Sequence, residues 1–183
     1  MKSNRTIIFV GGIHGVGKST ICKKLCSDLG LEYLSASKLI GDYKNEIARK
    51  NLDDGKAVAN INDNQDILVK AVKGIKSLNE NFLMDGHFTL LDSKEAVQPI
   101  PLSTFASIMP GALIVLIDDP AAIQGRLLSR DHTDYDLKLL EAMQTQEVKH
   151  AEYVGIKLNI KTFHTRIDNY DYVKQIATDS LGR

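Results

Sequence analysis

The chain has little of what marks several protein classes. Its 183 residues contain no tryptophan, four prolines and two cysteines, and 23 Lys plus Arg balance 23 Asp plus Glu. A zero net charge provides no overall attraction for nucleic acid or for an anionic membrane, so we predict neither as a partner. Cys22 and Cys26 have no further Cys or nearby His to complete a metal site. We interpret them as small residues on a helix face.

Long hydrophobic runs are also missing. No apolar stretch approaches the about 20 residues that span a bilayer. The short apolar stretch near the N-terminus leads into a glycine-rich loop and has no cleavage-site pattern. We therefore expect no signal peptide and a cytoplasmic protein.

Short apolar segments alternate with helical patterns along the chain, without a linker or repeat between them. Such alternation requires right-handed crossovers and gives a parallel sheet with helices on both faces. We therefore predict a three-layer α/β fold, one domain over residues 1–183, with ligands at the carboxyl ends of the strands. The expected strands are 6–10, 32–34, 82–85, 112–118 and 159–163, and the expected helices are 18–29, 36–49, 65–78, one from 120, 136–153 and 169–178.

A glycine-rich stretch, GGIHGVGKST, follows the first expected strand and opens the first expected helix. Its spacing, Gly12-x-x-x-x-Gly17-Lys18-Ser19, is that of a P-loop. Glycine permits the sharp turn that aims backbone N–H groups at one phosphate, and the helix N-terminus adds its own. In this motif the lysine reaches the β- and γ-phosphates, and the serine hydroxyl binds Mg²⁺. The predicted nucleotide-binding residues are Gly12, His14, Gly15, Val16, Gly17, Lys18, Ser19 and Thr20.

A second ligand for Mg²⁺ in P-loop proteins is an aspartate at the end of a neighbouring strand. Asp85 and Asp118 both end an expected strand. Asp85 is followed by Gly86, which permits close backbone approach, and by His87, a candidate contact for a phosphate or an acceptor. We favour Asp85, together with the P-loop serine, as the metal-binding pair, and keep Asp118 as the alternative.

These features, in this order and spacing, resemble the nucleoside monophosphate kinases. The P-loop, a helical pair after the second strand, Asp-Gly-His at the end of the third and the late segment LIVLIDDPAAIQGRLLSRDHTDYDL look most like the archaeal-type adenylate kinases, which have a short lid. The resemblance implies a P-loop kinase fold with a five-stranded parallel sheet of order 2-3-1-4-5. It also implies ATP and Mg²⁺ as cofactors, and reversible transfer of the γ-phosphoryl group to a nucleoside monophosphate.

The resemblance also implies roles for residues outside the P-loop. Residues 35–80 would form the acceptor-binding region, with Ser35, Ser37 and Lys38 near its entrance and His87 facing the acceptor. The catalytic residues would be Lys18, Asp85, Arg126 and Arg130.

On the donor side, the lid would comprise residues 126–136. Arg126 would lie against the ATP base or phosphates, and Arg130 would supply charge from the lid. A loop at 163–165, with His164, would border the adenine.

The chain departs from this family at two places. Asp131, Asp134 and Asp136 follow Arg130 where the related lid carries further arginines, and the segment 87–89 replaces the arginine-bearing segment of bacterial adenylate kinases. Two other functions therefore stay open. One is a kinase for another small acceptor, such as a nucleoside, with Asp85 as general base. The other is an ATP-binding or ATPase regulatory or assembly factor.

Overall fold

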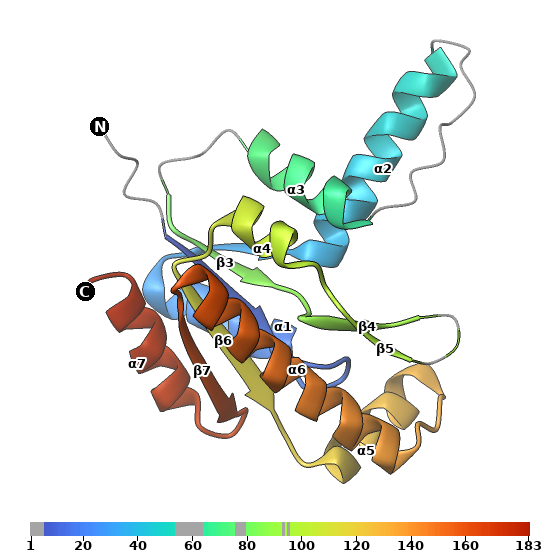
Figure 1. Cartoon of the computed structure of the whole chain (residues 1–183), viewed down its shortest axis with the longest axis vertical. Coiled ribbons are helices and arrows are strands. Elements are labelled where there is room, and N and C mark those ends of the chain that lie inside the picture. The colour runs from blue at the N-terminus through green and yellow to red at the C-terminus, as the bar shows by residue number, and fades with distance from the viewer. Residues whose placement is uncertain (1–5, 54–63, 76–79, 93, 95) are drawn as a thin grey trace.

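Five parallel strands form the centre of the structure, a computed structural model that describes residues 6–53, 64–75, 80–92, 94 and 96–183 (Figure 1). The sheet order is β2-β3-β1-β6-β7. The strands are β1 (Ile7–Gly11), β2 (Glu32–Ser35), β3 (Phe82–Asp85), β6 (Ala112–Ile117) and β7 (Lys161–Arg166).

This topology confirms the predicted α/β class. Its order differs from the predicted 2-3-1-4-5 only in numbering, because an antiparallel hairpin, β4 (Thr89–Leu91) and β5 (Val97–Pro99), comes between the third and fourth strands of the sheet. The sequence did not predict this hairpin or the short helix α4 (Leu102–Ile108) that follows it.

Helices cover both faces of the sheet (Figure 1). Helices α1 and α7 pack on one face, and α4 and α6 on the other. Helices α2 and α3 pack against each other, and α2 projects away from the sheet (Figure 1). The expected helix 65–78 ends at Gly74, and its residues 76–78 lie outside the described residues, as do residues 54–63 of the expected acceptor region. The remaining bounds are α1 (Lys18–Leu29), α2 (Ala36–Asp53), α3 (Asn64–Gly74), α5 (Pro120–Asp131), α6 (Leu137–Leu158) and α7 (Tyr170–Ser180).

The core lies on both sides of β1, whose five residues are all buried. A central parallel strand has neighbours at both edges and helices over both faces, so it is apolar throughout. Cys22 and Cys26 face the cluster on the α1 side, as predicted. On the other side, Phe9, Phe88 and Phe105 pack ring against ring, with centroids 5.1 to 5.4 Å apart. This aromatic cluster supports the loop that follows β3.

The ends of the strands place the loops that follow them. Val10 pairs with Asp85 and Gly11 with Val115, so the loops after β1, β3 and β6 emerge at the same edge. Strand β7 continues pairing with β6 as far as Arg166, opposite Ile117. Residues 163–165, expected as a loop, therefore lie within a strand. None of the helices in the described part of the chain has both the length and the hydrophobicity of a membrane-spanning segment.

Candidate functional site

The P-loop connects β1 to α1 and has the backbone shape that its glycines predict. Gly12 and Gly17 have φ values of 146° and 106°, a region that other residues rarely adopt. A Cβ atom on Gly12 would lie 2.6 Å from the Leu116 carbonyl oxygen. Only glycine fits there, so the loop backbone passes close to the end of β6.

Lys18 lies across this loop. Its Nζ donates hydrogen bonds to the carbonyl oxygens of Gly12, at 2.8 Å, and Ile13, at 3.1 Å. Burial lowers the pKa of Lys18, and the carboxylates of Glu147 and Asp85 raise it in opposition. The ammonium group is therefore held within the loop, where a phosphate could replace the carbonyl contacts.

Asp85 lies beside the P-loop, where its carboxylate and two hydroxyl groups bring several oxygen atoms together. Its Oδ2 accepts hydrogen bonds from Ser19 Oγ, at 3.1 Å, and from Tyr33 Oη, at 2.6 Å. Burial and the bond to Asp85 raise the pKa of Tyr33 to about 12, so this phenol stays a donor. A serine hydroxyl and a carboxylate in contact are suitable ligands for Mg²⁺, whose other ligands are usually phosphate oxygens and waters.

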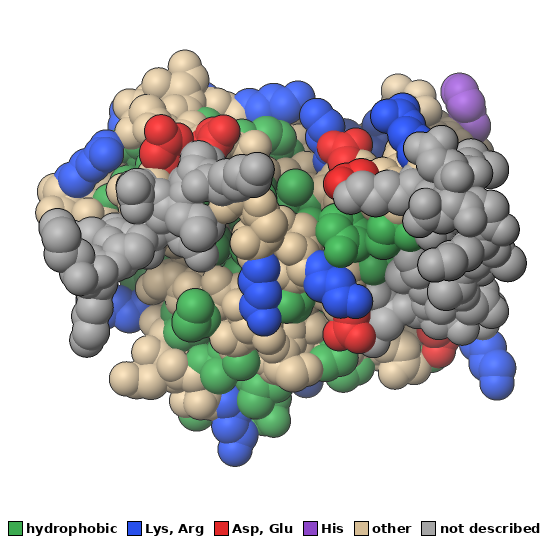
Figure 2. Space-filling model, turned by 90° about the horizontal axis from the view of Figure 1, so that it is seen from above, with side chains coloured by type: hydrophobic (Ala, Val, Ile, Leu, Met, Phe, Trp, Pro, Cys, Tyr) green, Lys and Arg blue, Asp and Glu red, His purple; other side chains and the backbone are tan. Residues whose placement is uncertain are grey.

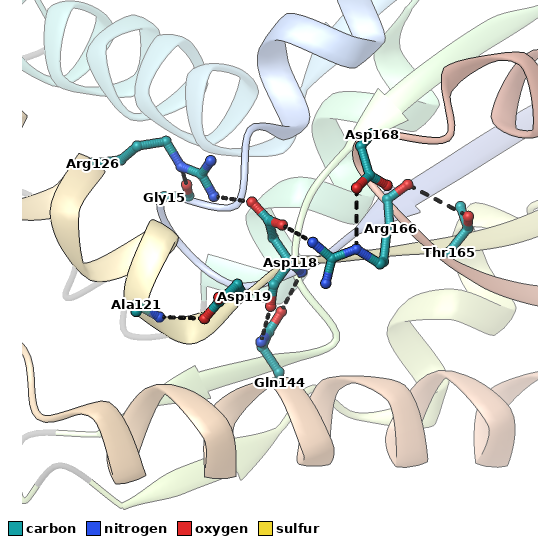
Figure 3. Close-up of polar contacts among 9 residues, drawn as sticks. All are labelled: Gly15, Asp118, Asp119, Ala121, Arg126, Gln144, Thr165, Arg166 and Asp168. Carbon is teal, nitrogen blue, oxygen red and sulfur yellow. Dashed lines mark hydrogen bonds and ion pairs between the residues drawn. The ribbon is translucent and has the colours of Figure 1, made fainter.

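Asp118, the alternative metal ligand, contacts two arginines (Figure 3). Arg126 donates to its Oδ2 at 2.6 Å, and Arg166 donates to its Oδ1 at 3.0 Å. Arg126 also donates to the Gly15 carbonyl at 2.9 Å. Gln144 fixes the backbone of Asp118 through both its N–H and its C=O. Both carboxylate oxygens of Asp118 are thus engaged, which favours Asp85 for the metal.

Helix α5 brings Arg130 to His14. Arg130 donates to His14 Nε2 at 2.6 Å and binds Asp131 through two hydrogen bonds of 2.6 Å each. Burial and the neighbouring Arg130 and Lys18 lower the pKa of His14. A neutral imidazole is consistent with Nε2 acting as an acceptor. Asp131 thereby holds Arg130 against His14 of the P-loop.

These groups surround a cavity of about 680 Å³, here called the P-loop cavity. It brings together twelve of the predicted site residues, from the P-loop, α1, the ends of β2 and β3, the start of α2, and α5. They are His14, Gly15, Gly17, Lys18, Ser19, Thr20, Ser35, Ser37, Asp85, His87, Arg126 and Arg130.

A second cavity, of about 380 Å³, shares Ser37 and His87 with the first and is here called the apolar cavity. Helices α2, α3 and α4 contribute most of its walls. Burial, with Lys18 and His14 nearby, lowers the pKa of His87 to about 3, so His87 is neutral where the cavities meet. The other lining residues are Phe9, Ala36, Ile40, Asn64, Gln65, Leu68, Gly86, Leu90, Ile100, Thr104, Phe105 and Ile108.

Four predicted site residues line neither cavity. Gly12 and Val16 are buried parts of the loop itself. Lys38 is exposed on α2, away from both linings. His164 is placed differently from the expectation, because it lies within β7 and its nearest charged partner is Glu152, at 3.9 Å.

The sequence analysis missed Glu147, which is 1% exposed on α6. Its carboxylate accepts hydrogen bonds from the backbone of Gly12, Phe88 and Thr89. A signal was present, because Glu147 lies on the same helical stripe as the buried Leu140, Ala151 and Val154, where a charge is unexpected.

The charges elsewhere follow the overall balance. On the face seen in Figure 2, Lys and Arg side chains are interspersed with Asp and Glu.

Within the described part of the chain, no group of three or more His, Cys, Asp or Glu side chains is arranged to hold a metal. A metal at this site would therefore depend on phosphate oxygens as well as on Ser19 and Asp85.

Two relatives match most of the chain. An adenylate kinase from Pyrococcus abyssi (strain GE5 / Orsay) is 26% identical over 175 residues, which cover 90% of this chain and 87% of that protein. UMP-CMP kinase 1 from Oryza sativa subsp. japonica is 27% identical over 161 residues. That match covers 81% of this chain but only 63% of the rice protein, so the chain spans less than two thirds of that relative. Both agree with the resemblance seen in the motifs.

Solved structures share the fold. A gluconokinase from Sinorhizobium meliloti 1021 has a TM-score of 0.55 at 16% identity and covers 100% of this chain and 94% of its own. A sugar kinase from Janibacter sp. HTCC2649 has the same score and identity, with 97% and 95% covered. Likeness at this identity concerns the fold alone.

The family follows from the sequence profile together with the site. The profile of the family described as AAA domain matches residues 11–144, from the end of β1 to Gln144 of α6. That span contains the P-loop, Asp85, Arg126 and Arg130. The chain is a P-loop kinase-like protein and belongs to the AAA domain family.

Proposed function

We propose that the chain transfers the γ-phosphoryl group of ATP to a nucleoside monophosphate. The observation that carries the proposal is the meeting of two different cavities at Ser37 and His87. One contains the P-loop and the cations, and the other is largely apolar. The first cavity suits the charged triphosphate of a donor, and the second suits the apolar base of an acceptor. The adenylate kinase and UMP-CMP kinase relatives support the same acceptor class.

The donor side supplies positive charge and alignment, which are what phosphoryl transfer requires. Lys18 exchanges its carbonyl contacts for the β- and γ-phosphates, and the loop N–H groups surround the same oxygens. Ser19 and Asp85 would hold Mg²⁺, which would supply positive charge against the negative charge of the phosphates. Arg126 and Arg130 line the same cavity and balance charge on the equatorial oxygens.

The acceptor side accommodates a base. Its aromatic and aliphatic lining suits a flat ring, and Asn64 and Thr104 offer hydrogen bonds to the ring edge. Among the described residues that line it, there is no Lys or Arg. The acceptor phosphate therefore lies at the junction, near Ser37 and His87, where Lys18, Arg126 and Arg130 of the P-loop cavity supply its countercharge.

The same lining favours a second candidate. An acceptor without a phosphate, such as a nucleoside, needs no cation in its own cavity. It would need a general base for its hydroxyl, and Asp85 is a carboxylate on the adjoining wall. ATP hydrolysis that controls binding of another protein is a third possibility.

A panel of acceptors separates these functions. The protein is incubated with Mg·ATP and, in turn, nucleoside monophosphates, nucleosides and small hydroxyl compounds, and ADP and phosphorylated product are measured. We expect product with at least one monophosphate, and a rate lower by about 10²-fold or more in the Lys18→Ala variant. Product from nucleosides or hydroxyl compounds alone would replace the proposal with the second candidate, and ADP formed without any acceptor would replace it with the third.

A further inference from the structure

Glu147 is the buried charge that the mechanism above does not use. It projects from α6 and its carboxylate accepts four hydrogen bonds. The donors are Gly12 N at 2.9 Å, Phe88 N at 2.8 Å, Thr89 N at 2.8 Å and Thr89 Oγ1 at 2.7 Å. All four distances are in the range of strong, charge-assisted hydrogen bonds.

The distribution of these bonds links two loops. Oε1 accepts from both Gly12, at the start of the P-loop, and Phe88, in the segment that follows His87. Oε2 accepts both bonds from Thr89. One oxygen atom thus joins the donor-binding loop to the loop at the acceptor junction. The two loops are also packed tightly, since a Cβ atom on Gly11 would collide with the Phe88 ring.

A carboxylate accepts from all four of these donors. Three of them are backbone N–H groups, which cannot accept, so an amide NH₂ placed at either oxygen would face a donor. Burial raises the pKa of Glu147, and the four hydrogen bonds act in the opposite direction. Lys18 supplies a nearby positive charge, since Glu147 in turn raises the Lys18 pKa.

A neighbouring residue on the same helix has a parallel role. Gln144, three positions before Glu147 and so on the same face of α6, holds the backbone of Asp118 at the end of β6. Asp118 in turn holds Arg126. Helix α6 therefore contacts the loops after β1, β3 and β6 through two side chains.

We propose that Glu147 is a positioning residue for phosphoryl transfer, which fixes the P-loop relative to the acceptor junction at His87. This inference rests on the proposed function. In-line transfer depends on the separation of the donor and acceptor groups, and a displacement of about 1 Å costs on the order of 100-fold in rate. Glu147 sets that separation without touching either substrate.

Glu147→Gln tests the proposal, because glutamine keeps the shape and one acceptor oxygen. We expect kcat to fall about 100-fold while the KM for ATP and the KM for the acceptor each change only a few-fold. The matched control is Glu141→Gln, which removes one negative charge from the exposed face of the same helix and should leave kcat unchanged. An unchanged kcat in Glu147→Gln, or a rise in KM with kcat unchanged, would overturn the proposal.

A second measurement does not depend on turnover. Amide hydrogen exchange in the wild type should show protection at Gly12 and Phe88, and Glu147→Gln should lose it at both together. If Glu147→Gln does not fold, Thr89→Val keeps the carboxylate and removes one donor. In that variant we expect a smaller fall in kcat and faster exchange at Gly12, across the site. Exchange at Gly12 that stays at the wild-type rate would overturn the proposal, whereas a wild type without transfer activity would overturn only the proposed function.

Discussion

The change that most directly tests the metal site is Asp85→Asn. Asparagine has nearly the same shape as aspartate but has no charge, and Asp85 is only 5% exposed. Its Oδ2 accepts hydrogen bonds from Ser19 and Tyr33, and the amide oxygen of asparagine can still accept both. The substitution therefore removes the charge from the site and preserves its local geometry.

The two expected effects differ in size. Each of the two hydrogen bonds weakens by on the order of 1 kcal/mol when its acceptor becomes neutral. A neutral amide costs less to bury than a charged carboxylate, and this offsets part of the loss. The free energy of unfolding should therefore fall by about 1 kcal/mol, or roughly 2–4 °C in Tm. Loss of one charged group from a transfer site typically costs about 10²- to 10³-fold in kcat, or about 3–4 kcal/mol. The catalytic loss should therefore exceed the stability loss.

The assay is ADP formation at saturating ATP and acceptor, repeated over a range of Mg²⁺ concentrations. Asp85→Asn should require more Mg²⁺ for half-maximal activity and should remain slow at saturation. Asp118→Asn is the comparator, because both of its carboxylate oxygens contact arginines, and its Mg²⁺ dependence should match the wild type. Wild-type Mg²⁺ dependence in Asp85→Asn, or a larger shift in Asp118→Asn, would refute the assignment.

Three further changes test other parts of the site. Lys18→Ala should reduce turnover by about 10²-fold or more with the circular dichroism spectrum intact, and unchanged turnover would contradict its role. Asp131→Asn should release Arg130 and tighten binding of an ATP analogue a few-fold in calorimetry; equal affinity would mean that this ion pair does not restrain Arg130. Burial lowers the pKa of His87 to about 3 in the folded protein. As the pH falls from about 6.5 toward 3, this histidine is protonated in the unfolded chain but not in the folded one, so the free energy of unfolding decreases. Denaturant titrations should show about 2 kcal/mol of this loss between pH 7 and pH 5 in the wild type and none of it in His87→Asn. If the free energies of unfolding of the two proteins fell equally over this range, His87 would not be the cause.

The parts of the site that the sequence predicted are carried by local signals. The P-loop spacing fixes a strand, a turn and a helix within one short stretch, and Asp85 ends a buried run of four residues. The alternation of strands and helices, with the family resemblance, was then enough for the sheet. The hairpin β4–β5 has strands of three residues each, too short for a periodic pattern to show.

Contacts between distant segments could not be predicted in the same way. Pairing with β6 determines where β7 ends, so His164 lies in a strand instead of a loop. The partners of Glu147 lie as far as 135 residues away in the chain. The sequence shows a charge on an apolar stripe but does not show which loops it holds.

Polar side chains on one face of α6 fix the geometry at the ends of the strands. A different set of side chains provides the chemistry at the rims of the cavities. Gln144 and Glu147 are followed on the helix by His150, whose Nε2 donates to the Ile100 carbonyl at 2.7 Å, so the contacts recur every three residues. Arg130, at the rim, contacts His14 and Asp131 and makes no hydrogen bond to this face among the described residues. Changes at the rim should therefore alter affinity or acceptor choice while the loops keep their separation. Changes on α6 should alter the rate with any acceptor, because they move the loops themselves.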